Sequence, residues 1–264
     1  DMTKKNNENL IQTKQIRKYK QGKFFEEQEK ICAEYELDIY INDNFYITVM
    51  CLNEKLKEFA VGFLFFEGVI DNIQDIKDIK IQDNKININL NKDFKIDKDK
   101  KKVLTTGCGT SITGIDMKKP APCKKIDIVF RLSPENIIDL MNDFNKKSII
   151  FLETGCVHSC AIADKNSIII FAEDIGRHNA FDKVIGYCLA NNIDLTQKVF
   201  LTSGRITSEM AAKAIKAKIP IIISRSAPTT YAVKLAEYFL ITLIGFARGE
   251  RFNMYAFPER VLQG

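Results

Sequence analysis

The sequence lacks any apolar run of the length that a membrane helix requires, about 18 residues. Residues 1–23 are polar and charged and lack the apolar core of a secretion signal. The seven cysteines are odd in number and scattered through 264 residues, which is not the pattern of a disulfide framework. We therefore expect a soluble, cytoplasmic protein whose thiols are free for chemistry or for metal binding.

Two common nucleotide-binding signatures are also missing. Neither a P-loop nor a G-x-G-x-x-G fingerprint occurs, which disfavours ordinary NTPases and dehydrogenases. The paired H-x-E and P-C-x-x-C signature of zinc deaminases is absent as well, although Pro122-Cys123 matches part of its second half.

The positive charge is concentrated in one short stretch. The net charge of +5 divides into −2 over residues 1–100, +5 over residues 101–125 and +2 over residues 126–264. So mild and local an excess argues against a nucleic-acid binder, which needs an extended basic face. The stretch 101–125 also contains three glycines and two prolines, and this composition predicts a mobile basic loop.

The patterning predicts an α/β protein in four parts. Residues 1–25 are expected to be a flexible, frayed N-terminal segment, and the basic loop at 101–125 separates the two folded parts. Residues 26–100 read as a small α+β domain with strands at 36–41, 45–51, 79–82 and 85–90 and a helix at 54–66 that ends at Gly68.

Residues 126–264 read as the larger, ligand-binding domain. Strands are expected at 126–130, 148–152, 157–163, 167–172, 198–202, 221–224 and 241–246. Helices are expected from Ser133-Pro134 onward and at 178–189, 207–217 and 229–239. This alternation predicts a mostly parallel sheet with helices on both faces.

Arginine follows four of these strands, although lysine outnumbers arginine 31 to 8 in the chain. Five arginines lie in the polar turns after them: Arg177, Arg205, Arg225, Arg248 and Arg251. Ligands bind at the carboxyl ends of parallel strands, and arginine donates bidentate hydrogen bonds to phosphate. The pattern predicts a nucleotide-like anion, with Phe252 and Asn253 suited to its base. Helix capping or pairing with neighbouring acids is the alternative for any one arginine.

Cys108 lies between two glycines in the basic loop. An exposed thiol in a positive field has a lowered pKa, which suits a nucleophile or a sulfur carrier. A bystander loop cysteine is the other interpretation.

Cys156, His158 and Cys160 alternate along the sequence and would share one face of a strand that begins at residue 156. Such a trio is compatible with zinc, but no fourth ligand is evident. We favour small buried thiols beside a ligand-facing histidine. His178 starts the following helix, so both histidines of the chain are expected to face one site.

Several segments together resemble the FdhD/NarQ family of formate dehydrogenase accessory proteins. The central one is E-D-I-G-R-H-N-A-F-D-K at 173–183, and the likeness extends over about residues 34–260. The other matching segments are G-F-L-F-F-E-G at 62–68, T-G and V-H around Cys156, S-A-P-T at 226–229 and G-F-A-R-G-E-R-F-N-M-Y at 245–255.

The resemblance implies a larger domain with the three-layer fold of cytidine deaminases, without their zinc motif. It implies a sulfurtransferase that takes persulfide sulfur from a cysteine desulfurase. The sulfur passes to the molybdenum (or tungsten) cofactor, in its guanine-dinucleotide form, for formate dehydrogenase. A homodimer is implied too. The local charge and the lack of a long apolar run lead us to expect neither nucleic acid nor membrane as partner.

In the family the sulfur-carrying loop reads C-x-x-C. Here Cys108 matches the first cysteine and Ser111 replaces the second, so a mechanism that needs two loop cysteines is in doubt unless Cys123 substitutes. We assign Cys108 as the catalytic residue and no residue to a metal. The residues that we assign to cofactor binding are His158, Asp174, Gly176, Arg177, His178, Asn179, Ser203, Arg205, Ser226, Ala227, Pro228, Arg248, Arg251, Phe252 and Asn253.

Overall fold

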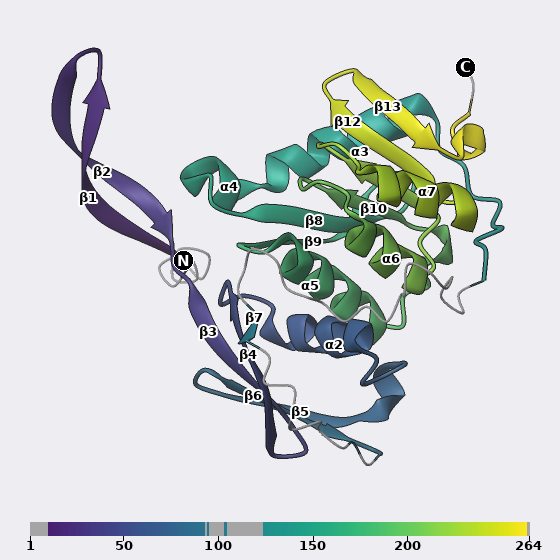
Figure 1. Ribbon diagram of the computed structural model, residues 1–264, viewed down its shortest axis with the longest axis horizontal. Helices are drawn as coiled ribbons and strands as arrows, with labels where there is room; N and C mark the ends of the chain where they lie inside the picture. Colours follow the sequence, from purple (N-terminus) through teal and green to yellow (C-terminus); the bar gives the residue numbers. More distant parts are fainter. Residues whose placement is uncertain (1–9, 93, 95–102, 105–123, 263–264) are drawn as a thin grey trace.

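The computed structural model describes residues 10–92, 94, 103–104 and 124–262, and its main body is built around a six-stranded sheet (Figure 1). The strand order is β13-β12-β11-β10-β8-β9. The strands are β8 (His158–Ala163), β9 (Ile168–Asp174), β10 (Val199–Thr202), β11 (Ile221–Ser224), β12 (Thr242–Arg248) and β13 (Arg251–Ala256).

The prediction of a mostly parallel sheet is wrong. Only the pairs β10–β11 and β11–β12 are parallel, and the other three pairs are antiparallel. Short connections are the reason, because only antiparallel strands can be joined by a tight turn. Asp164 closes the β8–β9 turn by accepting hydrogen bonds from the backbone of Asn166 and Ser167, and Gly249, with a φ of 57°, turns β12 into β13.

Helices cover both faces of this sheet, which gives three layers and confirms the α/β class. On one face, α3 (Pro134–Lys147) packs against side chains such as Ala161 and Leu201. The alternate residues of the same strands, such as Ile162 and Phe200, face the opposite side. The helices on that side are α5 (Arg177–Ala190), α6 (Ser208–Lys216) and α7 (Thr230–Phe239).

The N-terminal part forms a second sheet of order β5-β6-β3-β4-β7. Its predicted hairpins and helix are confirmed, and Gly68, with a φ of 73°, ends α2 as predicted. The elements are β3 (Tyr35–Ile41), β4 (Asn44–Cys51), α2 (Leu56–Glu67), β5 (Ile76–Gln82), β6 (Lys85–Leu90) and β7 (Val103–Leu104). Three short 3-10 helices, η1 (Ile73–Asp75), η2 (Leu195–Gln197) and η3 (Pro258–Arg260), lie in described connections.

The two parts share one hydrophobic core, because α2 lies directly against α5 (Figure 1). The contact is made at two glycines. A Cβ atom on Gly62 would lie 1.9 Å from the carbonyl oxygen of Asp182, and one on Gly186 would lie 1.8 Å from that of Glu58. Only glycine permits such a close approach of two backbones. The boundary that we predict near residue 100 is therefore crossed by continuous packing.

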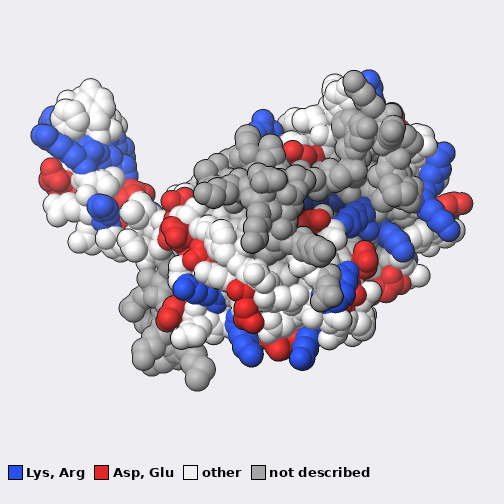
Figure 2. All heavy atoms as spheres, turned by 60° about the horizontal axis from the view of Figure 1, so that its bottom comes forward, with Lys and Arg blue, Asp and Glu red and all other residues white. Residues whose placement is uncertain are grey.

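Residues 11–32 form a long antiparallel hairpin, β1 (Ile11–Lys20) and β2 (Lys23–Cys32), which projects from the body (Figure 1). The expectation of a frayed segment therefore fails for residues 11–25. Both faces of the hairpin are largely exposed, including Tyr19 and Phe24, so no buried face imposes the apolar alternation that reveals a strand. Figure 2 shows Lys and Arg side by side with Asp and Glu along it.

Two predicted strands are wrong. Among the described residues, 126–130 have no sheet partner; instead the Arg260 guanidinium donates to the carbonyl oxygens of Ile126 and Ile128, at 2.5 and 3.1 Å. Residues 149–152 belong instead to a short helix, α4 (Ile149–Thr154). The Glu173 carboxylate caps this helix by accepting hydrogen bonds from the backbone N–H groups of Ile150 and Phe151 in its first turn.

No helix in the described ranges is both long enough and apolar enough to span a membrane.

Candidate functional site

The ends of four strands meet at one edge of the six-stranded sheet. β8 is antiparallel to both β9 and β10, so β9 runs in the same direction as β10, β11 and β12. Their carboxyl ends, with the four polar turns of the sequence analysis, therefore lie together, and His158 at the start of β8 pairs with Asp174 there. We call this region the strand-end edge.

Asp174 is fully buried and has a structural role at this edge. Its carboxylate accepts hydrogen bonds from the backbone N–H groups of Leu52 and Gly176 and from the Asn179 amide, and it pairs with Lys183. Asn179 donates also to the carbonyl oxygen of Met50. Of the predicted ligand-binding residues, Asp174 and Asn179 thus hold the turn in place, and their polar groups bond within the protein.

Arg177 and His158 come together across Gly204, in the turn after β10. A Cβ on Gly204 would lie 3.3 Å from the Cβ of Arg177 and 3.5 Å from Nδ1 of His158, so the glycine leaves room for both. Burial lowers the pKa of His158, and the positive charges of Arg177 and Arg205 lower it further. His158 is therefore a neutral imidazole beside two guanidinium groups. Sequence analysis did not assign Gly204 to the site, although the Ser-Gly-Arg motif contains it.

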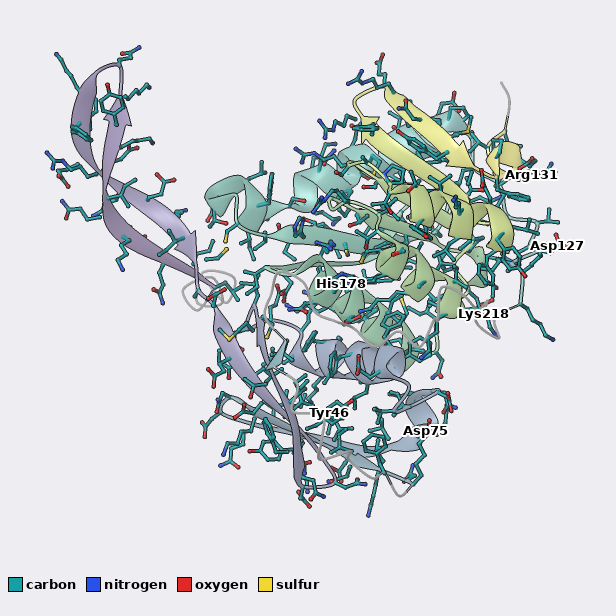
Figure 3. The ribbon with its side chains drawn as sticks, viewed as in Figure 1. Tyr46, Asp75, Asp127, Arg131, His178 and Lys218 are labelled. Atoms are coloured by element: carbon teal, nitrogen blue, oxygen red, sulfur yellow. The ribbon has the colours of Figure 1, made fainter. Side chains whose placement is uncertain are left out.

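His178 lies near the start of α5, facing the sheet (Figure 3). Burial lowers its pKa to about 3, with contributions from Lys213, Arg177 and His158. Its Nε2 lies 3.3 Å from a Glu209 carboxylate oxygen, without hydrogen-bond alignment. The Arg177 charge thus contributes to the lowered pKa of both histidines.

Buried polar atoms without a hydrogen-bond partner gather at this edge. Among the described residues they include Nε of Arg177, both ring nitrogens of His178 and Oγ1 of Thr207. A buried polar atom without a hydrogen bond destabilises the folded protein, unless a ligand or water supplies the missing partner. Sequence analysis treated Thr207 only as a helix start, since nothing in the sequence distinguishes a free hydroxyl from a capping one.

The helices α5, α6 and α7 all begin at the strand-end edge, and of these three only α7 has a side-chain cap. Ser133 caps α3 and Thr229 caps α7 through their side chains. By contrast, α5 begins after Gly176 and α6 after Thr207, both without a side-chain cap. Uncapped N–H groups and the positive end of the helix dipole favour an anion.

The turns after β10 and β11 are joined to each other by backbone hydrogen bonds. Ile206 N–H donates to the carbonyl oxygen of Ala227, and Thr229 N–H donates to that of Ile206. Ser203 and Ser226 lie in these turns, and Pro228 forms a bridge with Ile206. Ser203, Ser226 and Pro228 therefore belong to one connected surface.

The remaining arginines extend this surface outward. Arg225 lies over the Phe151 ring, and its carbonyl oxygen accepts from Nε of Arg248 at 2.9 Å. Arg205, Arg248 and Arg251 are exposed, and Arg248 pairs with Arg251 across the β12–β13 hairpin. All five arginines from the sequence analysis therefore lie at the strand-end edge, where their side chains could reach an anionic ligand.

Phe252 and Asn253 lie in β13, which sequence analysis took for a turn. Neighbouring strand residues point to opposite faces. Phe252 packs toward the core on the α3 side, whereas Asn253 is exposed. The two side chains are thus not placed on one face, as stacking and hydrogen bonding to the same base would require.

The trio considered for zinc is not assembled. Cys156 lies before β8 and is exposed, whereas Cys160 is buried and hydrogen-bonds to the carbonyl oxygen of Arg177 and to Thr202. Burial raises the pKa of Cys160 to about 12. In the described part of the chain no three His, Cys, Asp or Glu side chains are grouped to hold a metal ion. Cys108, Ser111 and Cys123 lie outside the described residues.

Comparison with known proteins gives one consistent result. The model of the FdhD/NarQ family matches residues 32–262. "Sulfur carrier protein FdhD" of Staphylococcus aureus strain MRSA252 is 37% identical over 251 residues, which is 94% of this chain and 95% of the relative, and the strain Newman protein gives the same values. A crystal structure from Desulfotalea psychrophila, described as that of a candidate formate dehydrogenase accessory protein, aligns with a TM-score of 0.79 at 29% identity, covering 96% of this chain and 100% of the other.

Proposed function

The chain belongs to the FdhD/NarQ family, and from this premise we propose that it is a sulfurtransferase in formate dehydrogenase maturation. In this proposal the chain accepts sulfur from a cysteine desulfurase as a persulfide on Cys108. It passes that sulfur to its substrate, the molybdenum cofactor in the bis-guanine-dinucleotide form.

The observation that carries the cofactor half of this proposal is the strand-end edge. Two uncapped helix N-termini, several arginines and the unpartnered polar atoms of Arg177, His178 and Thr207 lie there together. These groups fit the phosphates of a dinucleotide, which would supply the missing hydrogen bonds. The neutral His158 and His178 could each accept or donate a hydrogen bond without adding charge.

The sulfur half rests on Cys108. A thiol between two glycines, in a stretch with net charge +5, suits an exposed thiolate that both a donor and a bound cofactor could reach. The thiolate would attack the outer sulfur of the desulfurase persulfide, and the desulfurase cysteine would leave as a thiolate. The relatives' printed name, sulfur carrier, supports this role.

The proposal implies partners and a location. A cysteine desulfurase would be the donor, and formate dehydrogenase would receive the sulfurated cofactor. We propose that the chain acts in the cytoplasm as a homodimer. Size-exclusion chromatography with light scattering tests the dimer, and a monomer at micromolar concentration would contradict it.

The test of the carrier role is a mass measurement. The protein is incubated with a cysteine desulfurase and cysteine, digested without reductant, and analysed by mass spectrometry. We expect the Cys108 peptide to gain one sulfur atom. Cys108→Ala should gain none there and should fail to mature formate dehydrogenase, while its GDP affinity stays at the wild-type value. Full maturation by Cys108→Ala would rule out the carrier role.

A second candidate is a non-catalytic chaperone that binds and inserts the cofactor. Ser111 favours it, because the family's second loop cysteine is missing. A chaperone would take up no sulfur on Cys108 in the same assay. Repeating the assay on Ser111→Cys separates the two functions, since sulfur uptake by this variant alone would show that the natural chain has lost the carrier step.

A further inference from the structure

Two cysteines from distant parts of the chain meet beside Thr154. Cys32 is the last residue of β2, and Cys156 follows α4 and Gly155. Oγ1 of Thr154 lies 3.2 Å from Sγ of Cys32 and accepts the backbone N–H of Cys156, also at 3.2 Å. Because this hydroxyl donates its proton to the carbonyl oxygen of Ile150, the Cys32 thiol is the donor in its contact with Thr154.

The two thiols differ in accessibility. Cys156 is exposed, whereas Cys32 is half-buried. Burial raises the pKa of Cys32, although its hydrogen bond with Thr154 lowers it, and the neighbouring Cys156 thiol raises it further. Cys156 is thus the more accessible thiol and the first to react with a molecule from solution. Cys32 is less accessible and would react in a second step.

The other described cysteines are unsuited to such chemistry. Cys51, Cys160 and Cys188 are buried, and burial raises the pKa of each to about 12. A buried, protonated thiol is a poor nucleophile. In the described part of the chain, therefore, only Cys32 and Cys156 are at least partly exposed, and both lie against the Thr154 hydroxyl.

We propose that Cys156 and Cys32 form a second sulfur-handling site, which takes a sulfane sulfur atom from a persulfide or polysulfide and releases it as sulfide. This inference relies on the proposed function only for the source of sulfur in the cell. The chemistry at the pair does not require Cys108.

The reaction has two steps. First, the Cys156 thiolate attacks a sulfane sulfur of the donor; the donor's S–S bond breaks, the donor leaves as a thiolate, and Cys156 carries a persulfide. Second, the Cys32 sulfur attacks the inner sulfur of that persulfide. The Cys32–Cys156 disulfide forms, and the outer sulfur leaves as hydrogen sulfide with the Cys32 proton. The sulfane sulfur gains two electrons and the two thiols lose two. A small-molecule thiol in excess would return the pair to its reduced state.

The position of the pair gives it access to sulfur passing the proposed site. Cys156 precedes His158 by two residues, and His158 belongs to the strand-end edge. Lys30 pairs with Glu153 at 3.1 Å, which holds β2 against α4 next to the two thiols. The Cys32–Cys156 pair could therefore reduce sulfane sulfur that is not transferred to the cofactor at the strand-end edge.

The experiment uses the full chain with Cys108→Ala, so that the proposed carrier cannot contribute. The protein is incubated with a small-molecule thiol persulfide, whose leaving group is an ordinary thiolate, then separated from the donor, alkylated and mapped by mass spectrometry, while the sulfide released above a protein-free control is measured. We expect a Cys32–Cys156 disulfide and about one sulfide per chain. Adding Cys32→Ser should abolish the disulfide and leave the extra sulfur on Cys156. Adding Cys156→Ser should abolish both products.

Cys188→Ser in the same background is the matched control, because Cys188 is buried, and it should behave like the parent. Failure of the Cys32→Ser variant to hold sulfur on Cys156 would overturn the proposal, as would equal sulfide release from the Cys156→Ser variant. Circular dichroism checks that each serine variant is folded. The desulfurase assay on Cys108 is separate, so the carrier role and this second site can fail independently.

Discussion

Asp174 and Lys183 form an ion pair in which the carboxylate oxygen and Nζ lie 2.7 Å apart, and neither side chain is exposed. Lys183 also donates to the carbonyl oxygens of Leu52 and Glu173. The pair therefore joins the N-terminal part to the start of α5, directly beneath the strand-end edge.

Asp174→Asn should be strongly destabilising. The substitution leaves the Lys183 ammonium buried without its counter-charge, which costs about 3–5 kcal/mol. Urea denaturation followed by circular dichroism measures the loss in the free energy of unfolding. Asp139→Asn removes an exposed carboxylate and serves as the control, with little expected change. A loss below about 1 kcal/mol for Asp174→Asn would contradict the buried pair.

Gly62→Ala and Gly186→Ala should also destabilise the chain, although alanine is normally the better helix residue by about 1 kcal/mol. Each new methyl group would meet a backbone carbonyl oxygen of the other helix at less than 2 Å, so α2 and α5 must separate. We expect a loss of about 3 kcal/mol or more. Gly249→Ala is the comparison, because nothing lies near its Cβ position and only its left-handed φ carries a cost, about 1–2 kcal/mol. Equal losses at all three positions would argue against the close crossing.

Ser133, Thr207 and Thr229 each precede a helix but should respond differently to replacement by alanine. Ser133→Ala and Thr229→Ala each remove a side-chain cap and should cost about 1 kcal/mol of stability. Thr207→Ala removes a hydroxyl without a partner, so its stability should change by less than about 0.5 kcal/mol. The same variant should weaken GDP binding in calorimetry, because its hydroxyl would bond the ligand. Unchanged GDP affinity would remove Thr207 from the site.

His178 should make stability depend on pH. Its pKa of about 3 in the folded chain lies below the ordinary 6.5, so between these values the unfolded chain binds a proton that the folded chain does not. The contribution of neutral His178 to the free energy of unfolding is therefore complete above pH 6.5 and is lost as the pH falls toward the folded-state pKa. From about pH 7 to about pH 5, wild type should lose about 2 kcal/mol relative to His178→Gln.

The stability of wild type must be compared with that of His178→Gln, because Asp182 has the opposite effect on the pH dependence of stability. Burial raises the pKa of Asp182 to about 6 despite its ion pair with Lys213, and both proteins share that effect. Urea denaturation at the two pH values measures the difference. A constant gap between wild type and His178→Gln would show that His178 titrates normally.

The exposed arginines should determine ligand affinity without affecting stability. Arg248→Ala and Arg251→Ala should each weaken GDP binding roughly tenfold or more, since each would lose a charge-assisted hydrogen bond to phosphate. Arg131 is the matched control, because it is exposed and lies at the opposite end of the sheet (Figure 3). Isothermal calorimetry gives the affinities, and a loss equal to that of Arg131→Ala would exclude the arginine tested.

Much of the fold could be predicted because local signals and tertiary structure agree. Ser133-Pro134 marks the start of α3, and Gly68 marks the end of α2. The strand-end edge was predictable too, since β9 runs in the same direction as the parallel strands even though the sheet is mixed.

The errors occur where a distant group decides the local structure. Residues 126–130 are apolar enough for a strand, but Arg260 takes the carbonyl groups that a strand would use. Glu173 likewise caps α4 from across the chain, and nothing within residues 148–152 signals it. Asp174 was assigned to the ligand because motifs do not reveal which way a carboxylate points.

The hairpin β1–β2 has a consequence for solubility. With only two strands in its sheet, its outer edges expose backbone N–H and C=O groups that the described part of the chain leaves unpaired. Such edges invite strands from neighbouring chains, and charged side chains, lysine above all, discourage that addition. The hairpin carries lysines on both strands, including Lys14, Lys18 and Lys23. Replacing these lysines with apolar residues would turn the projecting ribbon into a site of aggregation.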